Sequence, residues 1–126
     1  MSVGYRLINA TKREILMFMH LPVNTRREIS GYPVASTMVA WYLLHHVGDE
    51  VSFVPDDKSF WPFSSVGEKE TESFREVSDE IIQELIDAGL LSDNGIEILD
   101  QRDPDVFLRK LSLVWWGSGL PEGDDA

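Results

Sequence analysis

The chain has 126 residues, of which 43% are hydrophobic and 26% are charged, and it contains no cysteine. This length is typical of one domain, and so much hydrophobic material excludes a disordered chain, so we expect a single globular domain over residues 1–116. The lack of cysteine excludes disulfides and thiolate metal ligands, and it allows a reducing compartment. The first residues show no basic stretch followed by an apolar one, so we expect a cytoplasmic protein.

Charge is distributed unevenly along the chain. The first 47 residues carry five Lys or Arg against two Asp or Glu, a net +3, and the rest carry six against twenty, a net −14, which together give −11. A charge of this size sets the long-range potential and the choice of partner more than it sets the fold. It favours a basic protein partner, and it disfavours nucleic acid because a negative surface repels a polyanion.

Two apolar runs near the N-terminus, residues 5–9 and 14–19, predict a β-hairpin with a four-residue loop at 10–13. The second run hardly alternates in polarity from Ile15 onward. Such a composition is typical of a central strand that is covered on both faces of its sheet.

A helix is predicted from Pro33, which suits the first helical position, to Gly48, which suits a left-handed cap. The segment is apolar nearly all round, so we expect it to be buried at the centre of the core. Just before it, Thr25 and Glu28 have the spacing of a capping box for one short helical turn. The apolar run at 34–44 is well short of the roughly 18 residues that span a bilayer, so we expect no membrane contact.

The chain after this helix is predicted to form a short strand and then a long loop. Residues 51–54 suit the strand, which Pro55 ends. Residues 56–71 show no sustained period, and loops of that length in a small domain are often functional.

The C-terminal part is predicted to contain two further helices. Apolar spacing predicts an amphipathic helix at 79–88, and Asp-Asn-Gly at 93–95 has the composition of a tight hairpin turn. A last helix is predicted at 103–116, because Asp-Pro suits a helix start and apolar residues follow at helical spacing. Residues 117–126 are rich in glycine and acidic residues, which predicts a mobile tail.

This order of segments predicts an α+β fold in which two or three helices pack on an antiparallel sheet of about four strands. The order of the strands is left open.

The predicted loop combines acidic and aromatic residues, a composition typical of protein interfaces with aromatic anchors. Trp61 and Phe63 are the candidate anchors, although such rings also close the ends of small cores. The acidic residues equally suit a solvated surface. Seven residues in and beside the loop make up the candidate partner-binding site: Trp61, Phe63, Asp56, Asp57, Glu68, Glu70 and Glu72.

The three histidines are the candidates for a reactive or metal-binding site. His45 and His46 are neighbours in the predicted helix, where successive side chains point about 100 degrees apart, and no His-x3-His spacing exists. We therefore predict no metal and no cofactor, and we expect the pair to interact with the carbonyl groups at the helix end. No triad or phosphate-loop motif accompanies them.

The basic residues of the first part of the chain are Arg6, Lys12, Arg13, Arg26 and Arg27. We expect them to pair with the acidic part, either within one chain or between two copies in a salt-sensitive homodimer.

In size and charge the chain resembles the immunity proteins that neutralise bacterial toxins. The resemblance implies a protein that binds a basic partner and occludes it. The alternatives are a small enzyme or ligand-binding domain that uses His20, His45 or His46 with nearby carboxylates, and a subunit of a larger assembly. An enzyme needs a concave site where titratable groups converge, whereas an occluding protein needs a flat or convex acidic face.

Overall fold

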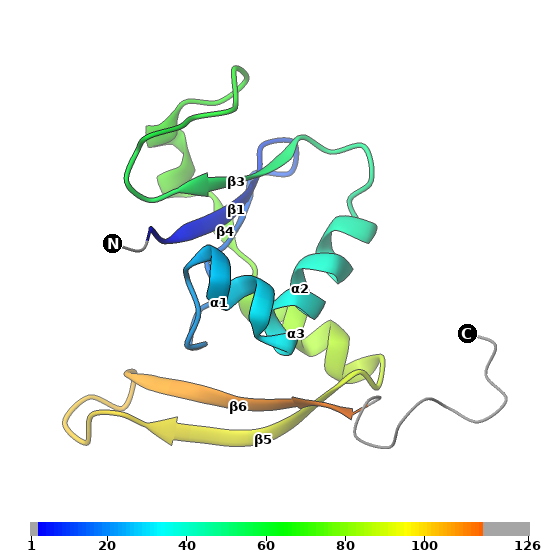
Figure 1. Cartoon of the computed structure of the whole chain (residues 1–126), viewed down its shortest axis with the longest axis vertical. Helices are drawn as coiled ribbons and strands as arrows, with labels where there is room; N and C mark the ends of the chain where they lie inside the picture. The colour runs from blue at the N-terminus through cyan, green and yellow to red at the C-terminus, as the bar shows by residue number, and fades with distance from the viewer. Residues whose placement is uncertain (1–2, 115–126) are drawn as a thin grey trace, which may run out of the picture.

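Residues 3–114 are described in the computed structural model of the chain, in which helices lie between two β-sheets (Figure 1). In the larger sheet, β1 (Tyr5–Asn9) pairs antiparallel with β2 (Glu14–Leu16) and with β3 (Val51–Pro55). The short β4 (Arg75–Glu76) pairs parallel with β2, which gives the strand order β3-β1-β2-β4. The predicted α+β class with a sheet of four strands is confirmed.

Four helices are found in the described residues: α1 (Arg26–Gly31), α2 (Pro33–Leu44), the 3-10 helix η1 (Glu68–Ser73) and α3 (Ser78–Asp87). The predicted capping box starts α1, because the Thr25 hydroxyl accepts from the backbone N–H of Glu28 while the Glu28 carboxylate accepts from that of Thr25. Helix α3 has the predicted amphipathic pattern, with its apolar face in the core.

Helix α2 begins at Pro33 as predicted, but it ends at Leu44, before Gly48. Val34 and Met38 are buried at the centre of the core, whereas Leu44 is 72% exposed. The prediction of a helix buried all round is therefore wrong on the outer side of its last turn, where Leu43 is also exposed, although Tyr42 in the same turn is buried in the core.

The four-stranded sheet is covered on both faces. Its register places Leu7 opposite Leu16 on one face and Ile8 opposite Ile15 on the other. The first face packs on the helices in the larger hydrophobic cluster, and the second face packs on side chains from residues 61–74. The prediction of a doubly covered second strand is confirmed for Ile15 and Leu16, but it is wrong for residues 17–19, because β2 ends at Leu16 and the side chains of Met17 and Met19 are exposed.

The second sheet contains β5 (Leu91–Ile98) and β6 (Phe107–Leu113), which pair antiparallel. The predicted last helix is therefore wrong over the described part of its range. Phe107, Arg109 and Leu111 alternate onto one face of β6, where Leu111 is buried in the larger cluster. The side chains of this segment therefore alternate between two faces, as in a strand, and do not repeat at the helical spacing that was predicted.

The predicted turn at 93–95 is also wrong in its role. These residues lie inside β5 as a bulge, with a register shift between Asp93 and Ile96 and a positive φ at Gly95. The Asp93 carboxylate accepts from the Gly95 N–H at 3.0 Å, so the local turn chemistry is real but bends a strand instead of joining two. The predicted tail at 117–126 lies outside the described residues.

Candidate functional site

The aromatic residues of the predicted site pack against the sheet. Phe63 is only 6% exposed and belongs to the cluster on the second face of the sheet. Trp61 is half-buried, meets Phe63 edge-on at 5.4 Å between ring centroids, and donates its indole N–H to the Val66 carbonyl at 3.0 Å. These contacts give both rings a structural role, because they cover the second face of the sheet. Phe63 exposes too little surface to anchor a partner.

Basic residues from the N-terminal part of the chain pair with the predicted acidic residues. Arg6 lies 3.7 Å from Asp56 and 3.8 Å from Glu68, and Arg13 lies 3.1 Å from Glu70. Of the two kinds of pairing that the sequence predicts, this is the one within the chain, and Lys12 shows it too, 2.9 Å from Asp49, whereas Arg26 and Arg27 have no carboxylate partner among residues 3–114. The pairing of Arg6 and Arg13 lowers the charge that this loop presents to a partner.

Two further acidic residues of the predicted site lie in or beside the same loop. Asp57 accepts from the Ser59 backbone N–H at 2.9 Å, and hydrogen bonds from Ser59 hold the pKa of Asp57 below its ordinary value. Glu72 is exposed on η1. These two carboxylates have no basic partner among the described residues.

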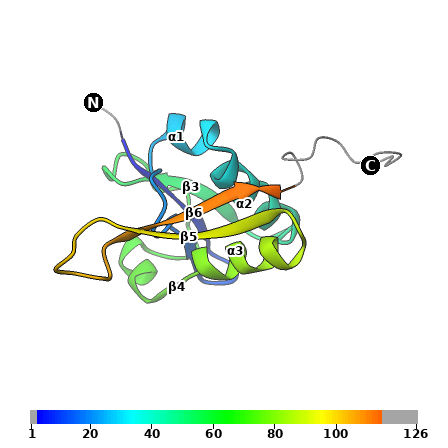
Figure 2. The same ribbon diagram turned by 90° about the horizontal axis from the view of Figure 1, so that it is seen from below.

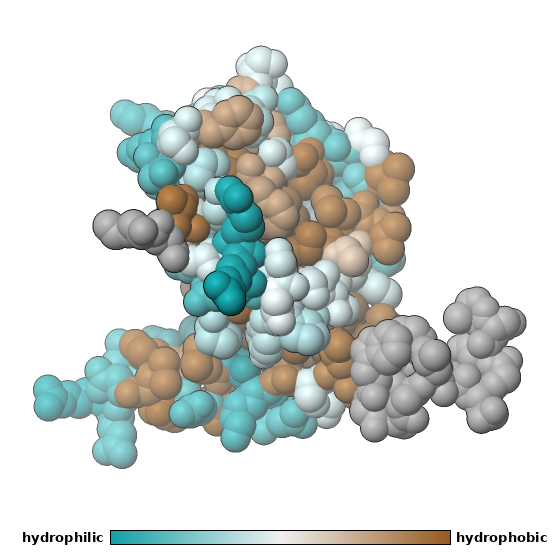
Figure 3. Space-filling model, viewed as in Figure 1, coloured by the Kyte–Doolittle hydropathy of each residue, from teal (hydrophilic) through white to brown (hydrophobic). Residues whose placement is uncertain are grey.

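The end of the β5–β6 hairpin, residues 96–106, is here called the hairpin tip. It projects from the body of the molecule, as Figure 1 and the perpendicular view in Figure 2 both show. Brown apolar side chains gather along this end, with teal hydrophilic ones around them (Figure 3). Four apolar residues of the tip are between 42% and 54% exposed: Ile96, Ile98, Leu99 and Val106.

These apolar residues are neighbours in space. Ile96 and Ile98 lie on one face of the hairpin, two residues apart, opposite Arg109 and Phe107. Leu99 follows directly and donates its backbone N–H to the Val106 carbonyl at 3.0 Å. Ile96 and Ile98 therefore form an exposed apolar patch on one face, and Leu99 and Val106 add apolar surface at the end of the hairpin; a patch of this kind marks an interaction surface more often than scattered single residues do.

The charges of the hairpin tip are mostly acidic. Glu97, Asp100, Asp103 and Asp105 oppose a single basic residue, Arg102, and none of the four carboxylates forms an ion pair with any described residue. Two of them, at 100 and 103, accept backbone N–H groups two residues later and so order the loop. The tip is therefore an ordered, acidic and apolar projection.

His20 fixes the hairpin to the body. Its backbone carbonyl accepts from the Arg109 N–H at 2.8 Å, and its ring stacks on Phe107 at 3.8 Å between centroids. His20 is thus separated from the other two histidines in the fold and serves an anchoring contact. The hairpin tip lies on the far side of this anchor from the body of the molecule.

His45 and His46 lie at the end of α2, as predicted. Each ring Nδ1 is 2.8 Å from the carbonyl oxygen four residues earlier, those of Trp41 and Tyr42. The pair therefore caps the carbonyl end of the helix, which is the structural role that the sequence favours.

A small polar pocket of about 110 Å³ adjoins these histidines. Within it, the Glu14 carboxylate accepts from the Tyr42 hydroxyl at 2.7 Å, pairs with Arg75 and lies 3.6 Å from Nε2 of His46. Burial, followed by the hydrogen bond to Glu14, raises the pKa of Tyr42, which keeps its hydroxyl protonated. Glu14 therefore joins Tyr42, His46 and Arg75 in one polar network within the pocket.

Sequence reasoning missed the apolar residues of the hairpin tip. The run from 96 to 106 interleaves isoleucine, leucine and valine with carboxylates, which is a detectable signal of an exposed interaction segment. The prediction of a helix start at 103 divided this run between two elements, so the run was not recognised as one segment.

Comparison with known proteins reveals no relative: no family model, no curated protein and no solved structure matches this chain. None of the helices in residues 3–114 has the length and apolar character needed to cross a membrane. Over the same range, no three histidine or carboxylate side chains are grouped so that they could hold a metal ion.

Proposed function

We propose that this chain is a protein-binding domain that presents the hairpin tip to a basic partner and occludes it, in the manner of an immunity protein. The observation that carries the proposal is the exposed apolar patch at the tip. Ile96 and Ile98 are held on a backbone that the β5–β6 ladder orders, so little conformational entropy is lost when a partner buries them.

Charge complementarity specifies the partner. The tip carries four carboxylates and one arginine, so a basic surface is attracted to it. The same charges disfavour tip-to-tip pairing between two copies of this chain, because two acidic tips would repel each other. The tip is therefore a better candidate than the loop at 56–72, whose carboxylates are largely paired within the chain.

The pocket beside His45 and His46 does not favour the enzymatic alternative, because its groups are paired and its volume is about 110 Å³. We also propose that the binding takes place in the cytoplasm, an expectation that rests on the cysteine-free sequence.

Photocrosslinking in cells of the source organism tests the proposal. One variant of the chain carries a photocrosslinking residue at position 98, and a control variant carries it at position 47. Val47 is 82% exposed and apolar, so it controls for nonspecific contact. We expect a discrete product at 98 that is absent at 47, and we expect the crosslinked protein to be basic. Equal products at both positions, or none at 98, would contradict the proposal.

The identified partner is then titrated against variants. Ile96→Ser with Ile98→Ser should weaken binding by about tenfold or more, mainly through faster dissociation, since burying one such side chain stabilises a complex by about 1.5 kcal/mol or more. Val47→Ser is the matched control and should leave affinity unchanged. If reversal of the acidic residues at 68, 70 and 72 abolishes binding while the double isoleucine variant binds normally, the interface is the loop and the proposal is wrong.

A further inference from the structure

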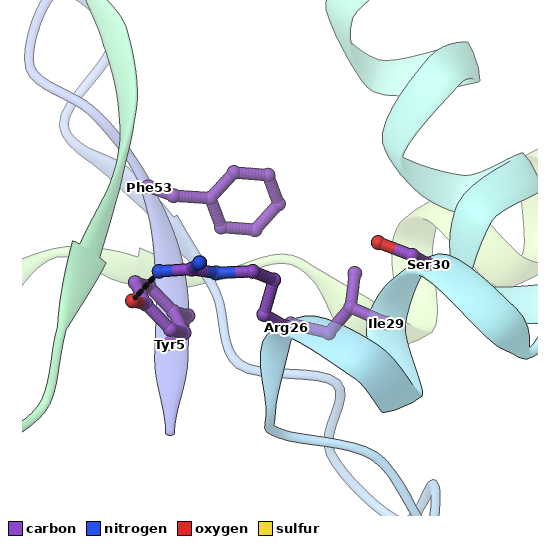
Figure 4. Close-up of a pocket in the computed structure, with 5 residues that line it drawn as sticks. All are labelled: Tyr5, Arg26, Ile29, Ser30 and Phe53. Atoms are coloured by element: carbon purple, nitrogen blue, oxygen red, sulfur yellow. Dashed lines mark hydrogen bonds between the residues drawn. The ribbon is translucent and has the colours of Figure 1, made fainter. Parts of the chain in front are cut away.

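A second candidate site, which uses no residue of the hairpin tip, lies between β1, β3 and α1 (Figure 4). It is a pocket of about 200 Å³. Five residues line it: Tyr5, Arg26, Ile29, Ser30 and Phe53. Its walls are mainly apolar, and its polar groups are one guanidinium, one phenol and one hydroxyl.

The sheet register forms one wall of the pocket. Tyr5 pairs with Pro55 and Leu7 with Phe53, so the rings of Tyr5 and Phe53 lie on the same face of the sheet as diagonal neighbours. Both rings are half-buried against the larger core cluster. Ile29 of α1 is buried and forms the apolar wall opposite them.

Arg26 projects between the two aromatic rings, as Figure 4 shows. Its Nη2 donates to the Tyr5 hydroxyl at 2.8 Å, and its guanidinium carbon lies 5.5 Å from the centre of the Tyr5 ring. The Thr25–Glu28 capping box fixes the start of α1 and so the backbone from which Arg26 projects. The guanidinium is therefore positioned before any ligand arrives.

The charge of Arg26 is not neutralised. Most other arginines of the described chain, Arg6, Arg13, Arg75 and Arg109, each have at least one carboxylate within 4.0 Å, whereas Arg26 has none among residues 3–114. One of its five N–H donors is used by Tyr5, which leaves a planar edge for an anionic ligand.

We propose that this pocket binds a small carboxylate that carries an aromatic ring. The carboxylate pairs with Arg26, and the ring packs on Phe53 and Ile29. The apolar walls favour an organic ligand over an inorganic ion. The net charge of −11 favours a monoanion over a phosphate, which carries more charge. The volume is below the roughly 300–1,000 Å³ of sites for drug-sized ligands, so the ligand is a small acid or a single terminal residue.

Titration of the ¹⁵N-labelled protein with benzoate, followed by NMR, tests this inference. We expect saturable shifts confined to residues around positions 5, 26, 30 and 53, with a dissociation constant of about 1 mM or lower. Benzamide keeps the ring but lacks the charge, and phosphate keeps a charge but lacks the ring, so both should bind at least about tenfold more weakly.

Variants of two adjacent arginines distinguish binding in this pocket from nonspecific attraction of benzoate to a positive charge. Arg26→Gln should weaken benzoate binding by at least about tenfold, whereas Arg27→Gln, which removes the same charge but does not line this pocket, should leave it unchanged. Arg26→Lys keeps the charge without the planar fork and should give an intermediate affinity. Backbone amide spectra establish that each variant is folded.

Two peptides distinguish the possible sources of the ligand. A short peptide that ends in phenylalanine with a free carboxylate should compete with benzoate if the natural ligand is a protein terminus, and its amidated form should not. If only benzoate binds, the ligand is a free acid. If neither binds saturably, or if Arg27→Gln weakens binding as much as Arg26→Gln, the inference is wrong.

Discussion

Replacement of Phe63 by Ala tests whether residues 56–74 form a structural cover on the sheet. The ring is 6% exposed and packs in the smaller hydrophobic cluster with Ile8, Val54 and Phe74. Truncation of a buried phenylalanine to alanine commonly costs about 3–5 kcal/mol. The cover is partly loop and can relax, so we expect about 3 kcal/mol. With an unfolding entropy of about 0.26 kcal/mol/K for a chain of this length, Tm should fall by about 11 °C.

The same loop supplies a matched control. Phe60 is 57% exposed, so Phe60→Ala removes the same ring from the surface and should change stability by less than about 0.5 kcal/mol, or about 2 °C in Tm. Thermal unfolding followed by circular dichroism, with urea titration at 25 °C, measures both variants. If Phe63→Ala costs no more than Phe60→Ala, the ring is not part of the core and the structural role assigned to it is wrong.

Three further variants test local features of the fold. Thr25→Ala removes the capping box of α1 and should lower the free energy of unfolding by about 1 kcal/mol in urea titration. Arg6→Gln leaves its two carboxylate partners unpaired, so it should lose up to about 1 kcal/mol at low salt and less in 1 M NaCl; equal losses at both salts would contradict the ion-pair role. Burial raises the pKa of both Tyr42 and Tyr32 above the ordinary 10.0, so the wild type should lose stability as the pH rises above 10, and Tyr42→Phe should lose less in urea midpoints measured from pH 8 to 11, because only Tyr32 then contributes.

The elements that the sequence predicts well are those with local signals. The capping spacing of Thr25 and Glu28 determines the start of α1, and Pro33 determines the start of α2. The apolar positions of α3 repeat at the helical period, and the buried residues Ile81 and Leu85 follow that period. Each signal lies within a few residues of the structure that it specifies.

The β5–β6 hairpin could not be predicted in the same way, because its strands are specified by one another. Phe107 and Leu111 are compatible with a helical face as well as with one face of a strand. Whether this segment forms a helix or a strand depends on its pairing with β5, on the stacking of Phe107 on His20 and on the backbone hydrogen bond between Arg109 and His20. The last two contacts join residues nearly 90 positions apart, so no local pattern contains them.

Pairing within the chain decides which charges remain to act on a partner. In the loop at 56–72, Arg6 and Arg13 neutralise carboxylates, because β1 and the β1–β2 turn lie beside that loop. Within residues 3–114 no basic side chain pairs with a carboxylate of the hairpin tip, since Arg109 is already paired with Asp79 and Asp93 nearer the body. A count of charged residues in the loop alone therefore overestimates the negative potential that the loop presents to a partner, whereas the same count for the tip does not. Charge reversals at the tip should consequently change the salt dependence of association more than equal reversals in the loop.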